Sequence, residues 1–232
     1  MIKEFKSEIL ETINLSSDVK SIKIKRPKDF DFKAGQYVSI SFSLKETKLR
    51  KPYSIASSPN EKEFLEICIK RIGKVSNYIC DLKKGDNVEL FGPAGTFVIN
   101  EPFKQKDLIF IATGTGIGPF KSMISFLLEN NFQNKIILIK GFRYEGGILY
   151  DKEFQELKNK YNNFEFYNVL SKPKNQNFEN KGHVQNFLDK YLAKNFSGNI
   201  YLCGLSIMIE QTAEKLIGKG IPTEQIFYEK YD

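Results

Sequence analysis

The pattern of apolar residues changes once along this chain, near residue 101. Before that point, short segments with alternating apolar and polar residues are separated by Gly, Pro and Asn turns, which is typical of antiparallel strands. Beyond it, apolar strands alternate with segments of helical period, which is typical of a parallel sheet with crossover helices. The sequence therefore predicts an α+β protein of two domains, an antiparallel β-barrel over residues 1–100 and an α/β domain over residues 101–232.

The expected elements follow from this change of pattern. In the first domain we expect strands at Lys20–Lys25, Tyr37–Phe42, Phe64–Lys70 and Asn87–Phe91. One short helix, Ser76–Leu82, lies among them with Ser76 as its N-cap. In the second domain we expect strands Leu108–Ala112, Ile136–Ile139, Phe164–Leu170 and Ile200–Cys203, and helices Phe120–Leu128, Asp151–Tyr161, Val184–Leu192 and Ser206–Gly218.

Cysteine and histidine are scarce, and this limits the chemistry of the chain. Its three cysteines are Cys68, Cys80 and Cys203, and its single histidine is His183. The cysteines lack the spacings of zinc and iron–sulfur sites, so we expect no metal centre. One histidine and no G-x-S-x-G segment argue against a Ser-His-Asp or Cys-His hydrolase.

Charge and hydropathy bear on partners and location. The chain has 35 Lys and Arg against 28 Asp and Glu, a formal net charge of +7. This balance favours an anionic partner, such as nucleotide phosphates, nucleic acid or an acidic protein. No apolar run approaches the roughly 18 residues of a membrane span, and the first residues lack the apolar core of a signal peptide. We therefore expect a cytoplasmic protein that does not bind membranes.

A basic pair, an aromatic ring and a hydroxyl group follow one another at Arg50, Lys51, Tyr53 and Ser54, and Pro52 stiffens the segment. In an extended chain, Lys51 and Tyr53 share one face and Ser54 takes the other. A flavin dinucleotide needs such groups: a cation at the pyrophosphate, an aromatic face against the ring system and a hydroxyl near flavin N5. A surface hairpin with a buried tyrosine is the alternative interpretation.

A second segment, Arg71–Tyr78, places Gly73 ahead of a predicted helix with cations on both sides. Exposed backbone N–H groups and the helix dipole make the start of a helix attractive to phosphate. The alternative is an ordinary capped helix after a turn.

A third segment, Ile109–Pro119, runs from a strand through a Gly-x-Gly-x-Gly-Pro turn into a helix. Its glycines let a pyrophosphate approach the backbone, and Pro119 suits the first helical turn. The spacing is not G-x-G-x-x-G, because Pro119 stands where the third glycine would be. A plain strand-to-helix turn is the alternative.

These segments, in this order across essentially the whole chain, resemble the ferredoxin–NADP(+) reductase superfamily. The Arg-x-Tyr-Ser motif of that family is present as Lys51–Ser54, its Gly-x-x-Ser motif as Gly73–Ser76, its Gly-Thr-Gly-x-x-Pro motif as Gly114–Pro119 and its Cys-Gly-x-x-x-Met motif as Cys203–Met208. The resemblance implies a flavin-binding barrel and a Rossmann-like NAD(P)-binding domain, with FAD and NADP(H), or else NAD(H), as cofactors. Lys51 replaces the usual arginine, and a lysine lacks the planar fork that binds pyrophosphate through two parallel hydrogen bonds.

The resemblance also implies roles for individual residues. Ser54 is expected to form a hydrogen bond near flavin N5, Cys203 to lie beside the nicotinamide, and Glu229 to join them in the catalytic set. A small buried hydrophobic residue is the alternative for Cys203. The expected cofactor-binding residues are Lys51, Pro52, Tyr53, Ser54, Ile69, Lys70, Gly73, Lys74, Val75, Ser76, Thr113, Gly114, Thr115, Gly116, Gly141, Arg143, Ser171, Lys172, Lys181, Cys203, Gly204, Met208 and Tyr231.

Cations stand where the ribose of an adenine nucleotide is expected. Where NAD-binding units place an acid, the strand from Ile136 ends in Gly141, Phe142 and Arg143. Ser171, Lys172 and Lys181 resemble the family's set for the 2′-phosphate, with Lys172 and His183 in place of its Arg and Tyr. NADP(H) is therefore favoured over NAD(H), and a solvated lysine-rich loop is the alternative.

The last residues contain the spacing Glu229-x-Tyr231. In some members of the family this ending places an aromatic ring over the flavin. An edge strand or a frayed terminus is the alternative interpretation of Tyr231.

The predicted function is transfer of electrons between NADP(H) and a separate one-electron carrier through FAD. An acidic ferredoxin or flavodoxin is the expected carrier, because a net charge of +7 attracts it. An NAD(P)H:flavin reductase and the reductase component of an oxygenase are alternatives with the same fold. An OB-like nucleic-acid module is a remote alternative that leaves the turn at Gly114 and the Cys203–Gly204 segment unexplained, so we expect no nucleic-acid partner.

Overall fold

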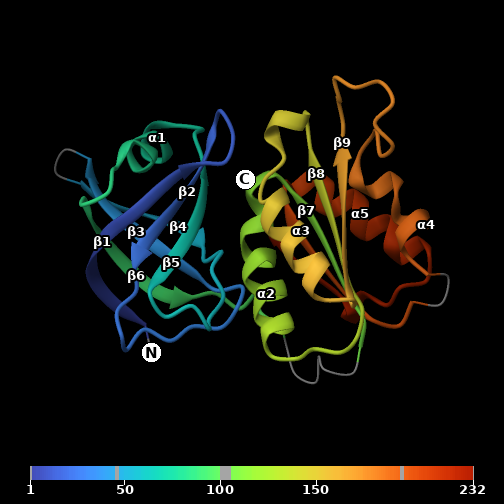
Figure 1. Cartoon of the computed structure of the whole chain (residues 1–232), viewed down its shortest axis with the longest axis horizontal. Coiled ribbons are helices and arrows are strands. Elements are labelled where there is room, and N and C mark those ends of the chain that lie inside the picture. Colours follow the sequence, from blue (N-terminus) through green and yellow to red (C-terminus); the bar gives the residue numbers. More distant parts are fainter. Residues whose placement is uncertain (1, 45–46, 100–105, 194–195, 232) are drawn as a thin grey trace. The chain divides into compact units, whose positions relative to one another are not determined.

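The computed structural model describes residues 2–44, 47–99, 106–193 and 196–231. For 42–44 and 47–48 it describes the backbone alone. The chain forms two compact units (Figure 1). One unit holds the residues up to Ile99 together with Gly118–Asn130, and the other holds the rest of the chain. A helical segment that follows the boundary predicted at residue 100 thus groups with the first unit. The predicted boundary itself remains a prediction.

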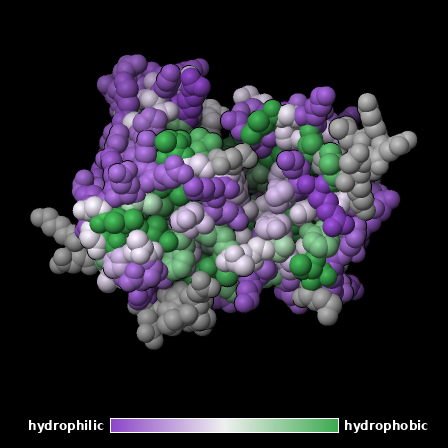
Figure 2. Space-filling model, turned by 180° about the vertical axis from the view of Figure 1, so that it is seen from behind, coloured by the Kyte–Doolittle hydropathy of each residue, from purple (hydrophilic) through white to green (hydrophobic). Residues whose placement is uncertain are grey.

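The face of the molecule in Figure 2 is mainly hydrophilic, with apolar residues scattered between the charged ones. Large apolar side chains that are more than half exposed include Ile72, Tyr78, Leu205, Ile207 and Tyr228. Among the helices formed by the described residues, none has both the length and the apolar character that crossing a membrane requires.

The first unit is a six-stranded antiparallel sheet that curls on itself, in the order β4-β3-β6-β1-β2-β5. The two outer strands approach each other just beyond β4, where Ile55 forms a bridge with Ile67 and the Ala56 N–H donates to the Glu66 carbonyl at 2.7 Å. The predicted antiparallel barrel is confirmed. Its elements are β1 (Lys3–Asn14), β2 (Val19–Lys25), β3 (Tyr37–Leu44), β4 (Thr47–Ser54), β5 (Phe64–Lys70), α1 (Lys74–Asp81) and β6 (Asn87–Ala94).

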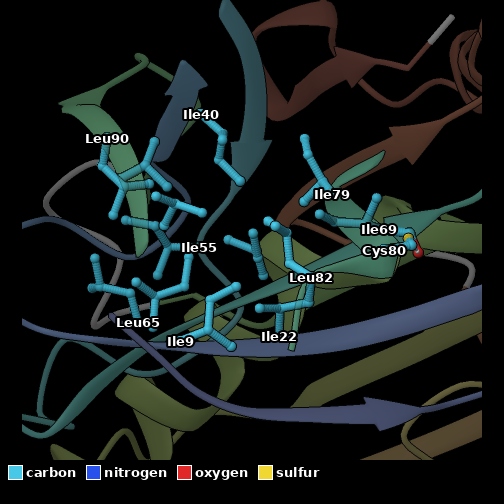
Figure 3. Close-up of a cluster of buried hydrophobic side chains, with 14 of the residues drawn as sticks. Ile9, Ile22, Ile40, Ile55, Leu65, Ile69, Ile79, Cys80, Leu82 and Leu90 are labelled. Atoms are coloured by element: carbon cyan, nitrogen blue, oxygen red, sulfur yellow. Dashed lines mark hydrogen bonds between the residues drawn. The ribbon is translucent and has the colours of Figure 1, made fainter. Parts of the chain in front are cut away.

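Branched apolar side chains fill this barrel (Figure 3). Ile9 of β1, Ile22 of β2 and Leu65 of β5 converge with Ile79 and Cys80 of α1, and all are fully buried. Each such side chain contributes about 1.5–3 kcal/mol of burial free energy. The helix is therefore held on the barrel by the same core that holds the strands.

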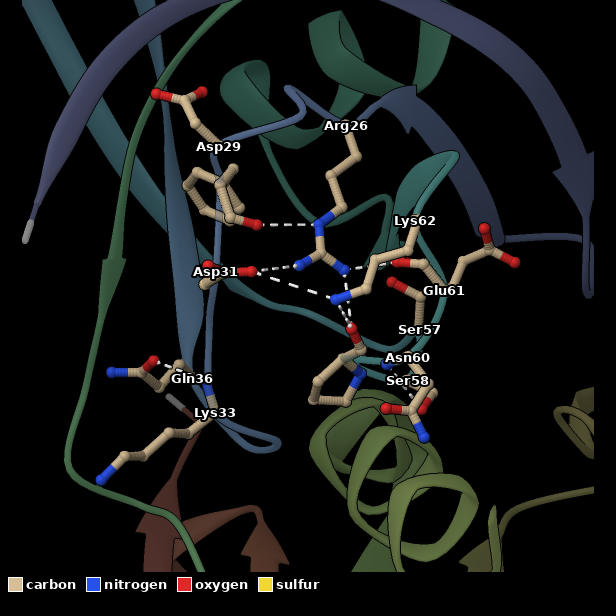
Figure 4. Close-up of polar contacts among 12 residues, drawn as sticks. Arg26, Asp29, Asp31, Lys33, Gln36, Ser57, Ser58, Asn60, Glu61 and Lys62 are labelled. Atoms are coloured by element: carbon tan, nitrogen blue, oxygen red, sulfur yellow. Dashed lines mark hydrogen bonds and ion pairs between the residues drawn. The ribbon is translucent and has the colours of Figure 1, made fainter. Parts of the chain in front are cut away.

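A buried arginine joins two loops of the first unit (Figure 4). Arg26, at 5% exposure, donates from Nε to the Phe30 carbonyl at 2.8 Å and from Nη1 to the carbonyls of Pro59, at 2.9 Å, and Glu61. Its Nη2 atom lies 3.3 Å from an Asp31 carboxylate oxygen. A buried guanidinium is stable only when its donors are satisfied, and here they fix the loop that follows Ser57.

The second unit contains a five-stranded parallel sheet in the order β11-β10-β7-β8-β9. The strand order reverses between β7 and β10, which is the switch point where open α/β sheets bind ligands. The strands are β7 (Leu108–Thr113), β8 (Ile136–Phe142), β9 (Phe164–Leu170), β10 (Asn199–Gly204) and β11 (Ile226–Lys230). The α-helices of this unit are α3 (Asp151–Lys160), α4 (Leu188–Tyr191) and α5 (Ser206–Gly218). Helix α2 (Ile117–Glu129) follows β7 in the chain but groups with the first unit from Gly118 onward.

Both faces of this sheet are buried, as a parallel sheet requires. On one face, Ile109 and Ile111 of β7 pack with Met208 of α5 and Leu188 of α4. On the other, the Phe154 ring of α3 lies 6.0–6.1 Å from the aromatic rings of β9. The predicted Rossmann-like α/β fold is confirmed.

Most predicted elements lie within a few residues of the observed ones, and the exceptions have physical causes. β1 was not predicted, because its charged residues are unusual in strands and hide its alternation. β6 continues to Ala94 through the turn expected at Gly92. The single helix predicted at Val184–Leu192 is wrong, since a 3₁₀ turn, η4 (Val184–Asn186), precedes the short α4.

One lysine is buried inside the second unit. Lys140 of β8 is 0% exposed, and its Nζ atom donates to the Leu149 carbonyl and to Asp151, both at 3.0 Å. The amine also lies over the rings of Phe154 and Phe166, at 5.0 and 4.8 Å. Burial lowers the pKa of Lys140 from 10.5 to about 8, although Asp151 acts in the opposite direction.

This pKa shift predicts a pH dependence of stability. Between pH 8 and 10.5 the unfolded chain holds the Lys140 proton and the folded chain releases it, so stability rises with pH in that window. From pH 7 to 9.5, the wild-type protein is expected to gain on the order of 1–2 kcal/mol relative to Lys140→Met. Urea unfolding at both pH values measures the difference. Lys152→Met, at an exposed lysine of α3, is the control and shows no such change.

Candidate functional site

The first candidate segment ends β4, beside β3. Ser54 is paired with Tyr37, and Tyr53 with Val38. Tyr53 packs against the barrel core, and burial, with a contribution from Cys80 of α1, raises its pKa to about 12. The phenol is therefore neutral at any physiological pH and serves as an aromatic surface with one hydroxyl donor.

The two basic residues of this segment differ in their surroundings. Arg50 lies 3.0 Å from a Glu4 carboxylate oxygen, donates to the Ser41 hydroxyl at 3.3 Å and stacks over the Phe91 ring at 4.5 Å. Lys51, the next residue, is exposed. Both side chains are exposed, and Arg50 differs from Lys51 in being held by Glu4, Ser41 and Phe91.

The start of α1 differs from the prediction. The N-cap is Gly73, in an extended conformation, and Ser76 is the third residue of the helix. The Ser76 hydroxyl accepts from the backbone N–H groups of Ile72 and Gly73, at 2.9 and 3.1 Å. The prediction of Ser76 as N-cap is wrong, because its side chain reaches back to the residues before the helix.

The resulting helix start is suited to an anion. Gly73 offers no side-chain cap to the first N–H groups of the helix, and a Cβ atom at Gly73 would meet no atom within 4 Å. Its φ of −160° is open to any residue, so the backbone alone does not require glycine. Open space beside uncapped N–H groups is what a phosphate needs.

The residues on either side of Gly73 are placed differently. Ile69 is buried in the barrel core, so only its backbone is available to a ligand, and Val75 also packs on that core. Lys70 lies 3.5 Å from Asp18. Lys74 is exposed.

In the second unit, a glycine turn packs closely against the end of β10. The turn is the 3₁₀ segment η2 (Gly114–Gly116), directly after Thr113. A Cβ atom on Gly116 would lie 2.4 Å from the Cys203 carbonyl oxygen, and one on Gly204 would lie 2.2 Å from Thr113 Oγ1. These glycines are required by the contact between the two strand ends. Gly114, in contrast, has a φ of +55° and open space around it.

Gly141 of β8 completes this group. It is paired with Thr113, and its hypothetical Cβ atom would lie 2.7 Å from Val184. The structure therefore brings Thr113, Gly116, Gly141 and Gly204 together at the carboxyl ends of three neighbouring strands. This is the position at which the switch point of such a sheet binds nucleotides.

The C-terminal segment lies along the same strand end. Glu229 of β11 is paired with Cys203, and the Tyr231 N–H donates to the Gly204 carbonyl at 2.8 Å. Burial raises the pKa of Cys203 well above its ordinary value; the Glu229 carboxylate adds to this, and a side-chain hydrogen bond with Tyr231 opposes it. The thiol is fully buried, and both its burial and its raised pKa favour the protonated form. The family resemblance already groups Cys203 with Glu229, but their pairing in neighbouring strands was not predicted.

The predicted 2′-phosphate residues converge at the ends of β8 and β9. The Lys172 N–H donates to the Arg143 carbonyl at 2.9 Å, and Lys181 forms a bridge with Leu170, next to Ser171. Arg143, Lys172 and Lys181 are exposed. Segments up to 38 residues apart in sequence therefore place three cations near one edge of the sheet.

An acid that sequence reasoning missed holds this region. The Glu145 carboxylate accepts from the backbone N–H groups of Lys174 and Asn175, at 3.1 and 2.9 Å, which lowers its pKa. The sequence signal that could have revealed this role is an acidic residue two positions after Arg143. Glu145 thereby fixes the loop that carries Lys172.

Two further predicted residues, Met208 and His183, differ in burial. Met208 lies in the core of the second unit at 5% exposure, and its carbonyl accepts from Thr212 at 2.6 Å. His183 is exposed and precedes η4. Within the part of the chain that the structure describes, His, Cys, Asp and Glu side chains form no group of three or more that could hold a metal ion.

Comparison with known proteins assigns a type to each unit. Residues 6–99 match the oxidoreductase FAD-binding domain, and residues 110–214 match the oxidoreductase NAD-binding domain. Together the two matches cover most of the chain.

Curated relatives extend this likeness. The chain is 31% identical over 198 residues to the flavodoxin/ferredoxin–NADP reductase of Buchnera aphidicola, covering 80% of this chain and 79% of that protein. It is 30% identical over 239 residues to the phenol hydroxylase P5 protein of Acinetobacter pittii, covering 100% of this chain. The chain spans only 66% of the length of that second relative.

Solved structures agree with the fold. A ferredoxin-NADP+ reductase from Plasmodium falciparum with 2′P-AMP has a TM-score of 0.84 and 27% identity, covering 98% of this chain and 96% of that one. One from Neisseria gonorrhoeae, with bound FAD and NADP, has a TM-score of 0.85 at 21% identity, covering 98% of both chains.

The contact between η2 and β10 leads to a prediction about stability. Gly116→Ala forces a methyl group against the Cys203 carbonyl and is expected to cost on the order of 1–3 kcal/mol. Gly146→Ala, at a glycine of the same unit with open space around it, is the matched control. Thermal unfolding of both variants measures the effect, and equal midpoints would contradict this account of Gly116.

Proposed function

Because this chain belongs to the ferredoxin–NADP(+) reductase family of FAD- and NAD-binding oxidoreductases, we propose that it passes electrons between NADP(H) and a separate one-electron carrier. The observation that carries the proposal is that one chain contains both an FAD-binding and an NAD-binding domain, each with an open glycine at an anion-binding helix or turn. These glycines are Gly73 and Gly114. The carrier is proposed to be a ferredoxin or a flavodoxin.

In the proposed flavin site, Lys51 and the first N–H groups of α1 hold the pyrophosphate, and Tyr53 offers its ring to the flavin. The open space at Gly73 and the uncapped helix start fit this group. Pro52 keeps the segment extended, and Ser54 ends it with a hydroxyl. Ile69 and Lys70 are proposed to contribute backbone atoms, since the Ile69 side chain is in the core.

In the proposed nicotinamide site, Thr113–Gly116 and Gly204 approach the pyrophosphate through the backbone. Cys203 offers a neutral, buried thiol as a soft surface for the nicotinamide, and Glu229 lies next to it in the sheet. Bound FAD and nicotinamide supply the chemistry, in which hydride passes between nicotinamide C4 and flavin N5. The residues of this chain orient the rings and exclude water, and this requires few groups that titrate near neutral pH.

Preference for NADP(H) over NAD(H) is proposed from the charges at the ends of β8 and β9. Arg143, Lys172 and Lys181 suit a dianionic 2′-phosphate better than a ribose hydroxyl. The Plasmodium falciparum relative with 2′P-AMP supports this assignment.

The carrier is proposed to be acidic, because the net charge of +7 favours association with an anionic protein. A second candidate function is the reductase component of an oxygenase, which the likeness to the phenol hydroxylase protein favours. We also propose a cytoplasmic location, which three buried cysteines outside any disulfide support.

The proposal is tested by the visible spectrum of the purified protein, followed by anaerobic addition of NADPH and, separately, NADH. A yellow protein that NADPH bleaches faster than NADH supports it. Reduction of added ferredoxin or flavodoxin then separates the main function from the oxygenase alternative. A protein that binds no flavin and oxidises neither nucleotide refutes the proposal.

Ser54→Ala is expected to slow hydride transfer by about threefold to tenfold, the loss of one hydrogen bond between neutral groups, and to leave FAD affinity within about threefold. Stopped-flow reduction by NADPH and flavin titration of the apoprotein measure the two effects. Ser39→Ala, in the neighbouring strand, is the matched control. Equal limiting rates in Ser54→Ala and wild type would refute the role of Ser54.

Removing two cations, in Arg143→Ala with Lys172→Ala, is expected to raise KM for NADPH by about tenfold to a hundredfold and to leave KM for NADH nearly unchanged. Lys158→Ala with Lys160→Ala removes the same charge from the last turn of α3 and is the control. Steady-state kinetics with both nucleotides measures the difference. Parallel losses with NADPH and NADH would show that these cations do not bind the 2′-phosphate.

A further inference from the structure

Helix α2 carries a stripe of small and polar residues at helical spacing. Gly118, Lys121, Ser122 and Glu129 recur at intervals of three, one and seven residues, which places them on one face. Gly118 and Ser122 are buried and Lys121 is half-buried, whereas Glu129 at the end of the helix is exposed. The helix belongs to the first unit, so the stripe has its partners on the barrel.

The main partner is a carboxylate on the outer face of β5. Leu65 and Ile67 point into the barrel core, and Glu66 between them points the other way, yet its side chain is only 6% exposed. Lys121 Nζ donates to Glu66 Oε2 at 2.5 Å, and the Ser21 hydroxyl donates to Oε1 at 2.5 Å. The Lys121 side chain is 16% exposed. Breaking such a buried pair leaves a charge uncompensated, which is far more costly than breaking a surface pair.

Further contacts attach the stripe to the segment that follows Ser54. The Ser122 hydroxyl donates to the Ser57 carbonyl at 2.7 Å. The Glu129 carboxylate accepts from the Ser58 hydroxyl at 2.5 Å and from Asn60 Nδ2 at 3.0 Å. At the helix start, a Cβ on Gly118 would lie 3.9 Å from Cys68, so the helix approaches β5 closely there.

The residues that α2 contacts are themselves fixed. The Glu66 N–H donates to the Ser57 hydroxyl at 3.1 Å, which ties β5 to the segment after β4. Arg26 holds the carbonyls of Pro59 and Glu61 in the same segment (Figure 4). The helix is thus attached to a rigid part of the barrel, directly after the proposed flavin-binding residues.

We infer that Glu66 and Lys121 are positioning residues, whose buried ion pair fixes α2 to the flavin-binding barrel and, through the chain, holds the η2 turn in place for hydride transfer. The inference rests on the proposed function. The division between the two units falls between Ile117 and Gly118, directly after η2. A turn that binds the nucleotide pyrophosphate is therefore the direct extension of a helix that belongs to the flavin unit.

The test uses Lys121→Met, Glu66→Gln and the double variant, with Lys23→Met as control. Lys23 of β2 is paired across the sheet with Glu66 but forms its 2.7 Å ion pair with Glu11, so this control removes a neighbouring cation that serves another acid. Two readouts are needed: hydrogen exchange of the α2 amides without nucleotide, and stopped-flow reduction of the flavin over a range of NADPH concentrations. The second readout separates the limiting rate from Kd for NADPH.

In Lys121→Met we expect exchange in α2 to be at least about tenfold faster and the limiting rate about tenfold lower, with Kd for NADPH within about threefold of wild type. The double variant is expected to recover most of both losses, because neither charge is then left buried alone. Lys23→Met is expected to match wild type.

Two results would overturn the inference: α2 exchange in Lys121→Met equal to that in Lys23→Met, or faster exchange with an unchanged limiting rate. If the charge variants do not fold, Ser122→Ala removes one hydrogen bond only and carries the same two readouts with smaller changes. A wild-type protein without flavin or NADPH oxidation would refute the proposed function, and the positioning role with it, before any variant is made.

Discussion

The first unit depends on the short junction where β4 meets β5. The Ile55 bridge and the bond from Ala56 to Glu66 close the barrel, because they join the two outer strands of the sheet. The residues before the junction are the proposed flavin-binding segment, and those after it receive α2. One set of backbone hydrogen bonds therefore fixes both the proposed flavin-binding segment and the segment that receives α2, which follows η2 directly.

The second unit depends on close packing at two glycines, which have no side chain. Thr113, Gly116 and Gly204 pack so closely that a methyl group at either glycine would overlap its neighbour. The benefit is a backbone surface at the switch point of the sheet, where N–H groups rather than side chains meet a pyrophosphate. Gly114 and Gly73 are different, because open space surrounds them. Some glycines in these motifs thus serve packing, and others leave room for a ligand.

Periodicity and turn residues were enough to predict both folds, since Phe64–Lys70 and Ser206–Gly218 are strand and helix at those same bounds. Motif residues could be proposed wherever the motif is local in sequence, and their roles remain predictions. The sequence did not reveal pairings between distant segments: Cys203 with Glu229, or Glu66 with Lys121. A carboxylate inside an apolar strand and a polar stripe on an apolar helix were visible signals, but either one alone is also compatible with a solvated surface.

Lys51 stands where the family motif has an arginine, and this changes how positive charge is distributed in the proposed flavin site. Arg50 is oriented toward other partners, because Nε donates to Ser41, Nη2 lies beside Glu4 and the guanidinium stacks on Phe91. A lysine contributes a point charge without direction. In the proposed flavin site, orientation of the pyrophosphate would then come from groups of fixed geometry, such as the first N–H groups of α1. The placement of Ser76 inside the helix is compatible with this proposal, since its hydroxyl accepts from the N–H groups of Ile72 and Gly73, before the first turn.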